Sequence, residues 1–281
     1  MSLPVHQFTS SPVISLAFSP CPNDTFIFDA MVHQKIDTEG LSFDYRMADV
    51  EELNHMAMND QAEMTKVSYH AWLYLRDKYF LLDSGSAMGF GNGPLVIGKK
   101  ACSLEDLENM AIAIPGEYTT ANLLLKIFSP KAKNKKIIVF NEIVNAILDG
   151  KVEAGVIIHE NRFTYQDKGL VMIADLGEQW EQMTQCPIPL GGIVVRKSLG
   201  SDMISRLNRI MKRSVEYALN NPDSSLDFVR NNAQEMDEKV MKKHITLYVN
   251  EFTLDMGEKG KNAIRKLLEE SKAFLKTDKT N

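Results

Sequence analysis

The stretch Ser19-Pro20-Cys21-Pro22-Asn23-Asp24-Thr25-Phe26 decides how this 281-residue chain folds. It follows the apolar run 13–18 and opens a segment with helical spacing. Two prolines within three residues exclude regular helix or ladder pairing at that point, and Asn23, Asp24 and Thr25 are side chains that cap helix starts. The sequence therefore predicts a buried strand, a stiff polar loop and a helix whose first amides can receive an anionic or polar small molecule.

Strand-like apolar runs alternate with helical patterns along most of the sequence, which is typical of an α/β protein with a mostly parallel sheet. Two similar runs, 93–100 and 191–197, each begin with glycine, continue with apolar residues and end in basic ones. They bracket a segment with strands of its own, which predicts two lobes joined by two crossing strands. We expect residues 1–94 and 193–281 to form a large discontinuous lobe and residues 95–192 a small inserted lobe; one continuous sheet is the alternative.

Shorter elements follow from local patterns. An aromatic-rich helix is expected over 69–79, and the pattern after residue 200 is mostly helical, with one short strand expected at 245–249. The polar tail 276–281 is expected to fray.

Composition limits the partners and the compartment. The net charge of −5 and the pI near 5.7 argue against nucleic acid or an anionic membrane as the main partner. No apolar run approaches the ~20 residues of a membrane span. The first residues lack the basic start and apolar core of a signal peptide, and the three cysteines are far apart. We therefore expect a soluble cytoplasmic protein that acts on a small molecule, and a homodimer is compatible with these features.

Polar residues follow several of the expected strands, at the sheet edge where ligands bind in α/β proteins. Ser68 lies where a strand becomes a helix, so it could cap that helix and also bind a ligand. Thr119 and Thr120 begin another helix after a turn at Gly116, and hydroxyls beside free amides suit a carboxylate or phosphate. The alternative is a plain threonine N-cap.

His159 stands at the end of the buried strand 155–158, before a dense polar and aromatic loop. Histidine is the side chain whose ordinary pKa suits proton transfer near neutral pH, although a hydrogen-bonded structural histidine is the alternative. Strand alternation would turn Glu160 to the opposite face, so it is a poor candidate to orient His159. The remaining histidines outside this loop and the Ser68 segment, His6, His33, His55 and His244, are expected at the surface.

Several kinds of site have no sequence support. There is neither a G-x-G-x-x-G after the first strand nor a G-x-x-x-x-G-K-[ST] motif, and no His, Cys and carboxylate cluster has metal-ligand spacing. We therefore expect chemistry without a cofactor. Cys21 is expected to be a small buried residue rather than a nucleophile, because no histidine lies close to it in sequence.

Four segments together resemble the 1,4-dihydroxy-6-naphthoate synthase family of the futalosine route to menaquinone. They are Ser19–Phe26, Lys66–Ser68, Gly93–Val96 and the run Ile158-His159-Glu160-Asn161-Arg162-Phe163-Thr164-Tyr165. The resemblance implies a two-lobed fold similar to type II periplasmic solute-binding proteins, with mixed sheets flanked by helices and a site between the lobes. It also implies a lyase that cleaves a carbon–carbon bond in cyclic dehypoxanthinylfutalosine and aromatises the remaining bicycle.

The resemblance implies roles for individual residues. His159 would be the general base, and Ser68, Thr119 and Thr120 would hold carboxylate or hydroxyl groups of the substrate. The loop with Asn23, Asp24 and Thr25 would form the opposite wall of the site, and Phe163 and Tyr165 would stack on the flat product or pack in the core. Two other functions stay open: a chorismate dehydratase of the same pathway, and a solute-binding protein for small anions that has no catalytic activity.

Overall fold

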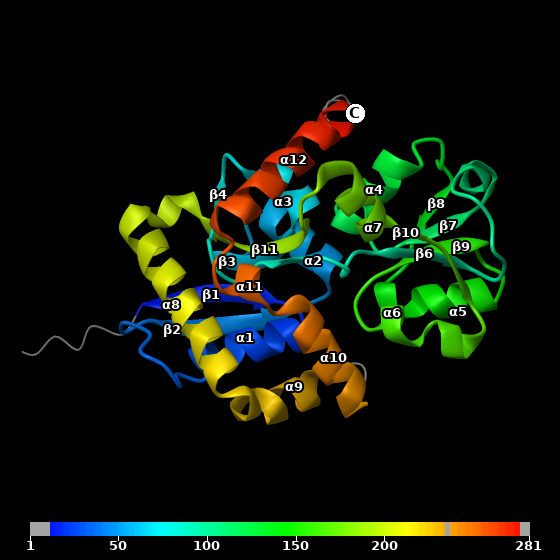
Figure 1. Cartoon of the computed structure of the whole chain (residues 1–281). Helices are drawn as coiled ribbons and strands as arrows, with labels where there is room; N and C mark the ends of the chain where they lie inside the picture. The colour runs from blue at the N-terminus through cyan, green and yellow to red at the C-terminus, as the bar shows by residue number, and fades with distance from the viewer. Residues whose placement is uncertain (1–11, 234–236, 276–281) are drawn as a thin grey trace, which may run out of the picture.

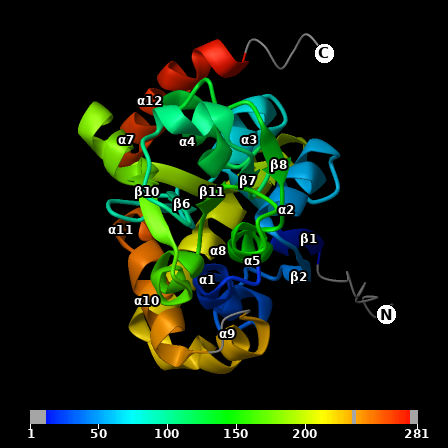
Figure 2. The ribbon, with the colours of Figure 1, turned by 90° about the vertical axis from the view of Figure 1, so that its right-hand side faces the viewer.

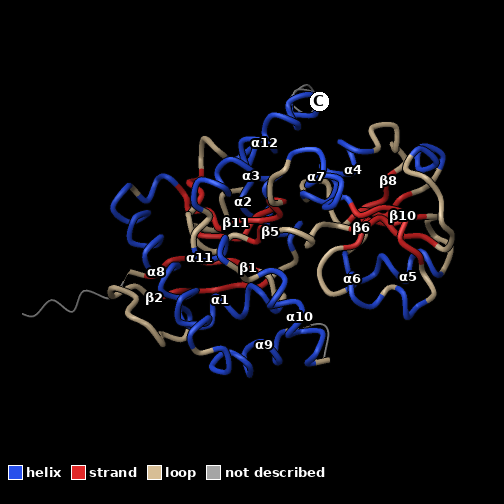
Figure 3. The backbone as a smooth tube through the Cα atoms, viewed as in Figure 1, coloured by secondary structure: helices blue, strands red, loops and turns tan. Residues whose placement is uncertain are grey.

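The computed structural model describes residues 12–233 and 237–275. Within them the strands form two separate mixed sheets (Figure 3), so the alternative of one continuous sheet is wrong. The larger sheet has the order β2 (Ser42–Met47), β1 (Val13–Phe18), β3 (Met64–Ser68), β11 (Ile188–Arg196) and β4 (Tyr79–Leu81), with β5 (Ala87–Gly89) beside the start of β11. The smaller sheet has the order β10 (Val171–Asp175), β6 (Leu95–Gly98), β9 (Ala154–Ile157), β7 (Ile112–Ile114) and β8 (Lys135–Ile137).

Helices cover both sheets (Figure 1). They are α1 (Pro22–Val32), α2 (Val50–Met58), α3 (Tyr69–Leu75), α4 (Thr120–Phe128), α5 (Ile143–Leu148), α6 (Asn161–Thr164), α7 (Leu176–Thr184), α8 (Ser201–Asn220), α9 (Leu226–Asn232), α10 (Glu238–Tyr248), α11 (Glu251–Leu254) and α12 (Gly257–Leu275). In Figures 1 and 2 the helices α3, α4, α7 and α12 gather at one end of the molecule, and α1, α9 and α10 gather at the other. Among the described residues, no helix combines the length and the apolar character that a membrane crossing requires.

The opening stretch forms the strand, loop and helix that its prolines and polar residues predict. β1 ends at Phe18, and α1 begins at Pro22, where a proline costs no helical hydrogen bond. Nearly every residue of α1 is buried, because α8, α9 and α10 pack around it. Its backbone is also tied to α8, since the hydroxyl of Ser214 donates to the carbonyl of Ile27 (2.6 Å) and accepts from the amide of Met31 (3.2 Å). The start of α1 is therefore held firmly in place.

The chain passes from the larger sheet to the smaller one between Gly89 and Leu95, and it returns between Thr184 and Ile188. The two glycine-led runs thus lie in different sheets, 93–100 in the smaller sheet and 191–197 in the larger. β11 begins at Ile188, earlier than its glycine pair suggests. The lobe boundaries given above remain a prediction.

The first crossing makes a close backbone contact with the start of helix α7. A Cβ on Gly93 would lie 2.3 Å from the Cα atom of Gly177, and a Cβ on Gly177 would lie 2.7 Å from the Cα atom of Gly93. Such distances leave no room for any side chain. Arg162 stabilises the same contact, because its guanidinium donates to the carbonyl of Gly93 and to the carboxylate of Asp175 (3.1 Å).

One apolar core runs through both halves of the molecule. Its buried members include Tyr69 and Phe252 beside the larger sheet, and Val96 and Trp180 beside the smaller one. Full burial of a side chain of this size contributes about 1.5–3 kcal/mol. Trp180 also donates through Nε1 to the carbonyl of Pro187 (3.2 Å), at the second crossing. Apolar packing therefore stabilises the placement of the two sheets.

Two local predictions are wrong. The strand expected at 245–249 is the end of helix α10 and the residue after it. Met241, His244 and Tyr248 recur with helical spacing and are buried, so the β-branched Ile245 was a misleading signal. The helix expected over 69–79 ends at Leu75, and β4 begins at Tyr79. His6 and the tail 276–281 lie outside the described residues.

Candidate active site

A cavity lies between the two sheets. The larger sheet and its connections contribute the start of α1, Lys66 and Ser68 of β3, Leu190 and Gly191 of β11, and Tyr248 of α10. The smaller sheet contributes Thr119, Thr120 and Ala121 at the start of α4, and Ile158 and His159 after β9. Asn92 and Pro94 of the first crossing segment complete the wall.

The structure brings together six of the seven residues that the sequence nominated. Asn23, Asp24, Ser68, Thr119, Thr120 and His159 all line this cavity. Thr25 does not line it. The hydroxyl of Thr25 donates back to the carbonyls of Cys21 (3.1 Å) and Pro22 (3.3 Å), so this side chain serves the first turn of α1 and faces away from the cavity.

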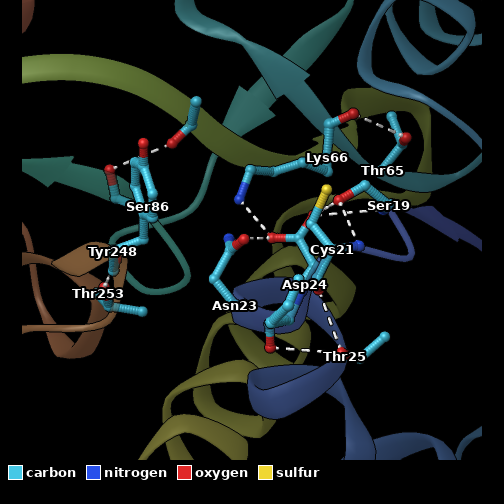
Figure 4. A network of polar contacts seen from close by, with 12 residues as sticks. Ser19, Cys21, Asn23, Asp24, Thr25, Thr65, Lys66, Ser86, Tyr248 and Thr253 are labelled. Carbon is cyan, nitrogen blue, oxygen red and sulfur yellow. Dashed lines mark hydrogen bonds and ion pairs between the residues drawn. The ribbon is translucent and has the colours of Figure 1, made fainter. Parts of the chain in front are cut away.

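The carboxylate of Asp24 is fully occupied by the protein itself (Figure 4). Its Oδ1 accepts from Lys66 Nζ (2.7 Å) and Asn23 Nδ2 (2.8 Å), and its Oδ2 accepts from the hydroxyl (2.7 Å) and amide (3.2 Å) of Ser19. A carboxylate has about four lone-pair sites, and these four donors use them. Asp24 therefore holds its neighbours in position and has no acceptor capacity left for a ligand.

His244 belongs to the same network, and its predicted place at the surface is wrong. Its side chain is fully buried, and its Nε2 lies 2.9 Å from Asn23 Oδ1. Because Asn23 Nδ2 donates to Asp24, the amide oxygen faces His244, which must donate to it. The Nδ1 atom of His244 lies 3.8 Å from Glu160 Oε2. Glu160 thus lies beside His244 rather than orienting His159.

His159 follows β9 with a left-handed backbone (φ 57°), which only a few per cent of non-glycine residues adopt. Its ring packs on Phe140 (4.9 Å between centroids) and lies parallel to the ring of His244 (5.8 Å). Burial lowers the pKa of His159 to about 4; the charge of Asp24 opposes this shift and the charge of Lys66 adds to it. At neutral pH the imidazole is therefore uncharged and able to accept a proton.

The two threonines contribute less hydrogen-bonding capacity than the sequence suggested. Thr119 is the N-cap of α4: its hydroxyl donates to the carbonyl of Gly116 (2.8 Å) and accepts from the amide of Asn122 (3.2 Å). The hydroxyl of Thr120 donates to the carbonyl of Leu190 (2.7 Å). Both hydroxyl protons are thus used within the protein. What this segment offers a ligand is the positive N-terminal end of α4.

Donor groups with spare capacity come from other residues. Ser68 Oγ accepts from Asn54 Nδ2 (3.3 Å), and its own proton has no acceptor in the described part of the chain, so it is available to a ligand. The side chain of Asn92 is buried, and within 12–233 and 237–275 neither its Nδ2 nor its Oδ1 has a hydrogen-bond partner. Lys66 and Tyr248 also face the cavity. Sequence reasoning missed Asn92, Tyr248 and His244. It also assigned no role to Lys66. The signal was present for Lys66, because Lys66 and Ser68 stand two residues apart and therefore share one face of the strand.

Phe163 and Tyr165 are not among the residues that line the cavity. Tyr165 is buried in the core of the smaller sheet, so packing is its role. Cys21 is buried behind the wall, and burial raises the pKa of its thiol well above the ordinary value. Among the described residues, no group of three or more His, Cys, Asp or Glu side chains could hold a metal ion. The cavity combines one uncharged imidazole, one ammonium and a helix N-terminus, a set that can remove a proton and bind an anion.

Solved structures confirm the expected fold. The crystal structure of a protein from Archaeoglobus fulgidus matches with a TM-score of 0.87 at 37% identity, over 93% of this chain and 97% of that one. An alkanesulfonate-binding protein from Xanthomonas axonopodis matches with a TM-score of 0.64 at 10% identity, over 84% of both chains. At this identity the likeness concerns the fold alone, which is that of the periplasmic binding proteins.

Two curated relatives carry the same name, 1,4-dihydroxy-6-naphthoate synthase. The protein from Thermus thermophilus is 43% identical over 92% of this chain and 94% of its own length. The protein from Streptomyces coelicolor is 44% identical over 92% of this chain and 93% of its own length. A family model described as menaquinone biosynthesis matches residues 14–273, which include every residue that lines the cavity. The chain belongs to this menaquinone biosynthesis family.

Proposed function

We infer that this chain is a carbon–carbon lyase that converts cyclic dehypoxanthinylfutalosine into 1,4-dihydroxy-6-naphthoate in menaquinone biosynthesis. The observation that carries this inference is an uncharged His159 on the wall of a cavity that also holds Lys66, Ser68 and the start of α4. The two relatives named as this synthase extend over nearly the whole chain, which supports the same reaction.

His159 is the general base of this proposal. It removes a proton from the substrate, the electron pair that remains drives cleavage of a carbon–carbon bond, and the sugar-derived fragment leaves. Transfer of a ring proton from carbon to oxygen then aromatises the bicycle that stays behind. A well-placed general base typically contributes ~10²–10⁴-fold to the rate. The low pKa of His159 keeps it in the proton-accepting form throughout the neutral range.

The carboxylate of the substrate is bound by the free hydroxyl proton of Ser68 and by the N-terminal end of α4. In this proposal Thr119 and Thr120 shape that end through their bonds to Gly116 and Leu190. Asn23 and Asp24 act on the substrate indirectly, because they hold His244 and Lys66. The ring system lies between the two sheets, where exclusion of water and fixed orientation favour the reaction.

Product formation from purified protein and cyclic dehypoxanthinylfutalosine tests this function. We expect the absorbance of the dihydroxynaphthoate to appear, with its mass confirmed by mass spectrometry, and we expect His159→Asn to abolish it. His55→Asn is the matched control, since the side chain of His55 is about half exposed on α2. Consumption of chorismate instead would favour the dehydratase, and binding without turnover would favour a solute-binding protein; either result contradicts the proposal.

A further inference from the structure

We propose that Lys66 stabilises the negative charge that develops on a substrate oxygen when His159 removes a proton, and that Asp24 is the positioning residue for Lys66. This proposal rests on the proposed function, and it adds a catalytic residue to it. Four observations support it: the place of Lys66 on the cavity wall, the hydrogen bond of its ammonium to a saturated carboxylate, the packing of its aliphatic part on β11, and the effect of its charge on His159.

Strand β3 directs Lys66 into the cavity. Lys66 and Ser68 stand two residues apart, so their side chains share one face of the strand. Both line the cavity, whereas Val67 between them is buried in the apolar cluster on the other face. The ammonium of Lys66 therefore lies on the same wall as Ser68, which has a hydroxyl proton available for a ligand.

Spare hydrogen-bonding capacity distinguishes Lys66 from Asp24. An ammonium has three N–H donors, and among the described residues the hydrogen bond of Lys66 Nζ goes to Asp24 Oδ1 (2.7 Å). Asp24 itself is saturated by Ser19, Asn23 and Lys66. The carboxylate thus fixes the position of the ammonium without competing for a substrate, and Lys66 keeps donors for an oxyanion.

A glycine on the neighbouring strand makes room for the lysine side chain. A Cβ on Gly191 would lie 3.1 Å from Cε of Lys66 and 3.0 Å from the carbonyl oxygen of Val67. The aliphatic part of Lys66 therefore runs directly over the backbone of β11. The side chain of Lys66 is 8% exposed and that of Asp24 is 1% exposed. Such a side chain is placed before the substrate arrives, and preorganised charge is the most effective kind for catalysis.

The positive charge of Lys66 acts on His159. It helps to lower the pKa of His159, although burial is the main cause of that shift. A positive charge that disfavours the protonated imidazole also favours an enolate formed beside it, and such interactions are stronger away from bulk water. A buried ion pair is weak evidence for a stabilising role, because well-packed apolar residues often replace such pairs at no cost in stability. Its location on the cavity wall points to catalysis.

The variant Lys66→Met tests the proposal, because it keeps much of the side-chain length and removes the charge. We expect kcat to fall about 10²–10³-fold, as for other lost oxyanion contacts, with KM changed only a few-fold. Lys66→Gln keeps a hydrogen-bond donor without the charge, and we expect a similar loss. Lys78→Met is the matched control: it breaks a Lys–Asp pair of the same 2.7 Å length on the exposed surface, and we expect it to leave kcat unchanged.

A spectroscopic titration measures the effect of the Lys66 charge on a bound ligand, without turnover. Bound 1,4-dihydroxy-6-naphthoate ionises at a hydroxyl group, and its absorbance reports the ionised form. We expect wild-type protein to shift this ionisation at least tenfold toward the anion, about one pKa unit, and Lys66→Met to remove the shift. Circular dichroism checks that each variant is folded.

Two results would overturn the role of Lys66. One is a large rise in KM with unchanged kcat in Lys66→Met, which would make Lys66 a ground-state contact for the substrate carboxylate. The other is an equal ionisation of the bound naphthol in wild type and variant. Both leave wild-type turnover intact, whereas absence of product from wild-type protein would contradict the proposed function itself.

Discussion

The Nε2 atom of His159 lies 4.0 Å from the Sγ atom of Cys21, although 138 positions separate the two residues in the sequence. A cysteine beside a histidine is the arrangement of many thiol nucleophiles. Here burial raises the pKa of the thiol and lowers that of the imidazole, so both groups are uncharged at neutral pH. The thiol is therefore an uncharged neighbour of the base, within reach of a weak hydrogen bond to it.

Replacing Cys21 by alanine should leave most of the activity. We expect kcat/KM to stay within a few-fold of wild type, because neither proton removal nor charge stabilisation uses the sulfur. The free energy of unfolding should fall by about 1 kcal/mol, as is usual when a small buried group is removed. Steady-state kinetics and denaturant unfolding measure both. A loss of activity by several orders of magnitude would show that Cys21 is a nucleophile.

The pH dependence of kcat/KM should report the low pKa of His159. Because the free enzyme must hold an uncharged imidazole, we expect a constant rate from neutral pH down to about 5 and a tenfold fall per unit below about 4. Lys66→Met should move this acid limb to higher pH, since the ammonium helps to lower the pKa of His159. An acid limb near the ordinary histidine value, in protein that is still folded, would contradict the assignment.

Stability should decrease in mild acid because the pKa values of His159 and His244 are both lowered. In the unfolded chain each has an ordinary pKa near 6.5, so the unfolded state binds protons first as the pH falls. The free energy of unfolding is fully present above about 6.5 and declines toward pH 4, by at most ~1.4 kcal/mol per pH unit for each histidine. Urea unfolding between pH 7.5 and 5 measures the slope, which His244→Gln should reduce and His55→Gln should not. An unchanged slope in His244→Gln would be evidence against a buried, uncharged His244.

Asn92 and Asn54 are both buried, but their replacement should affect stability and substrate binding in opposite ways. Asn54 binds the amide of Ser68 (2.9 Å) and Glu51 Oε2 (3.0 Å), so Asn54→Ala should lower the free energy of unfolding by about 1–3 kcal/mol. Asn92 has no such partners among the described residues, so Asn92→Ala should cost little stability. If the substrate uses this amide, KM should rise about tenfold in Asn92→Ala for one lost hydrogen bond. Thermal unfolding and steady-state kinetics of both variants measure these effects. An Asn92→Ala protein with lowered stability and an unchanged KM would contradict a role for Asn92 in substrate binding.

The sequence predictions that the structure confirms rest on signals from residues close together in the chain. The prolines at 20 and 22 fix where β1 ends and where α1 starts, and both effects act within a few residues. The alternation of strands and helices similarly indicates an α/β fold. The mostly parallel sheet expected from it is wrong, since five of the nine strand pairings among the described residues are antiparallel. Ser68 and His159 were found because Ser68 is the last residue of β3 and His159 comes soon after the end of β9, and both strand ends lie at the cavity.

Contacts between distant segments account for what the sequence did not reveal. His244 looked like a surface residue because its partners, Asn23 and Glu160, are far away in the chain. Thr25 follows Asp24 directly, yet one residue turns a helix by about 100°, which is enough to take Thr25 off the cavity wall. The hydroxyl of Thr120 is also used within the protein, because it donates to the carbonyl of Leu190. Only the tertiary fold brings that carbonyl close to Thr120.

The contact between Gly93 and Gly177 has a consequence for the gene. Each glycine is blocked by the main chain of the other, so no change of a neighbouring side chain can make room for a larger residue at either position. In a glycine codon every change at the first or second base replaces the residue or ends the chain, and every change at the third base is silent. The two codons should therefore accumulate only third-base changes over time, as a linked pair at the point where the chain enters the smaller sheet.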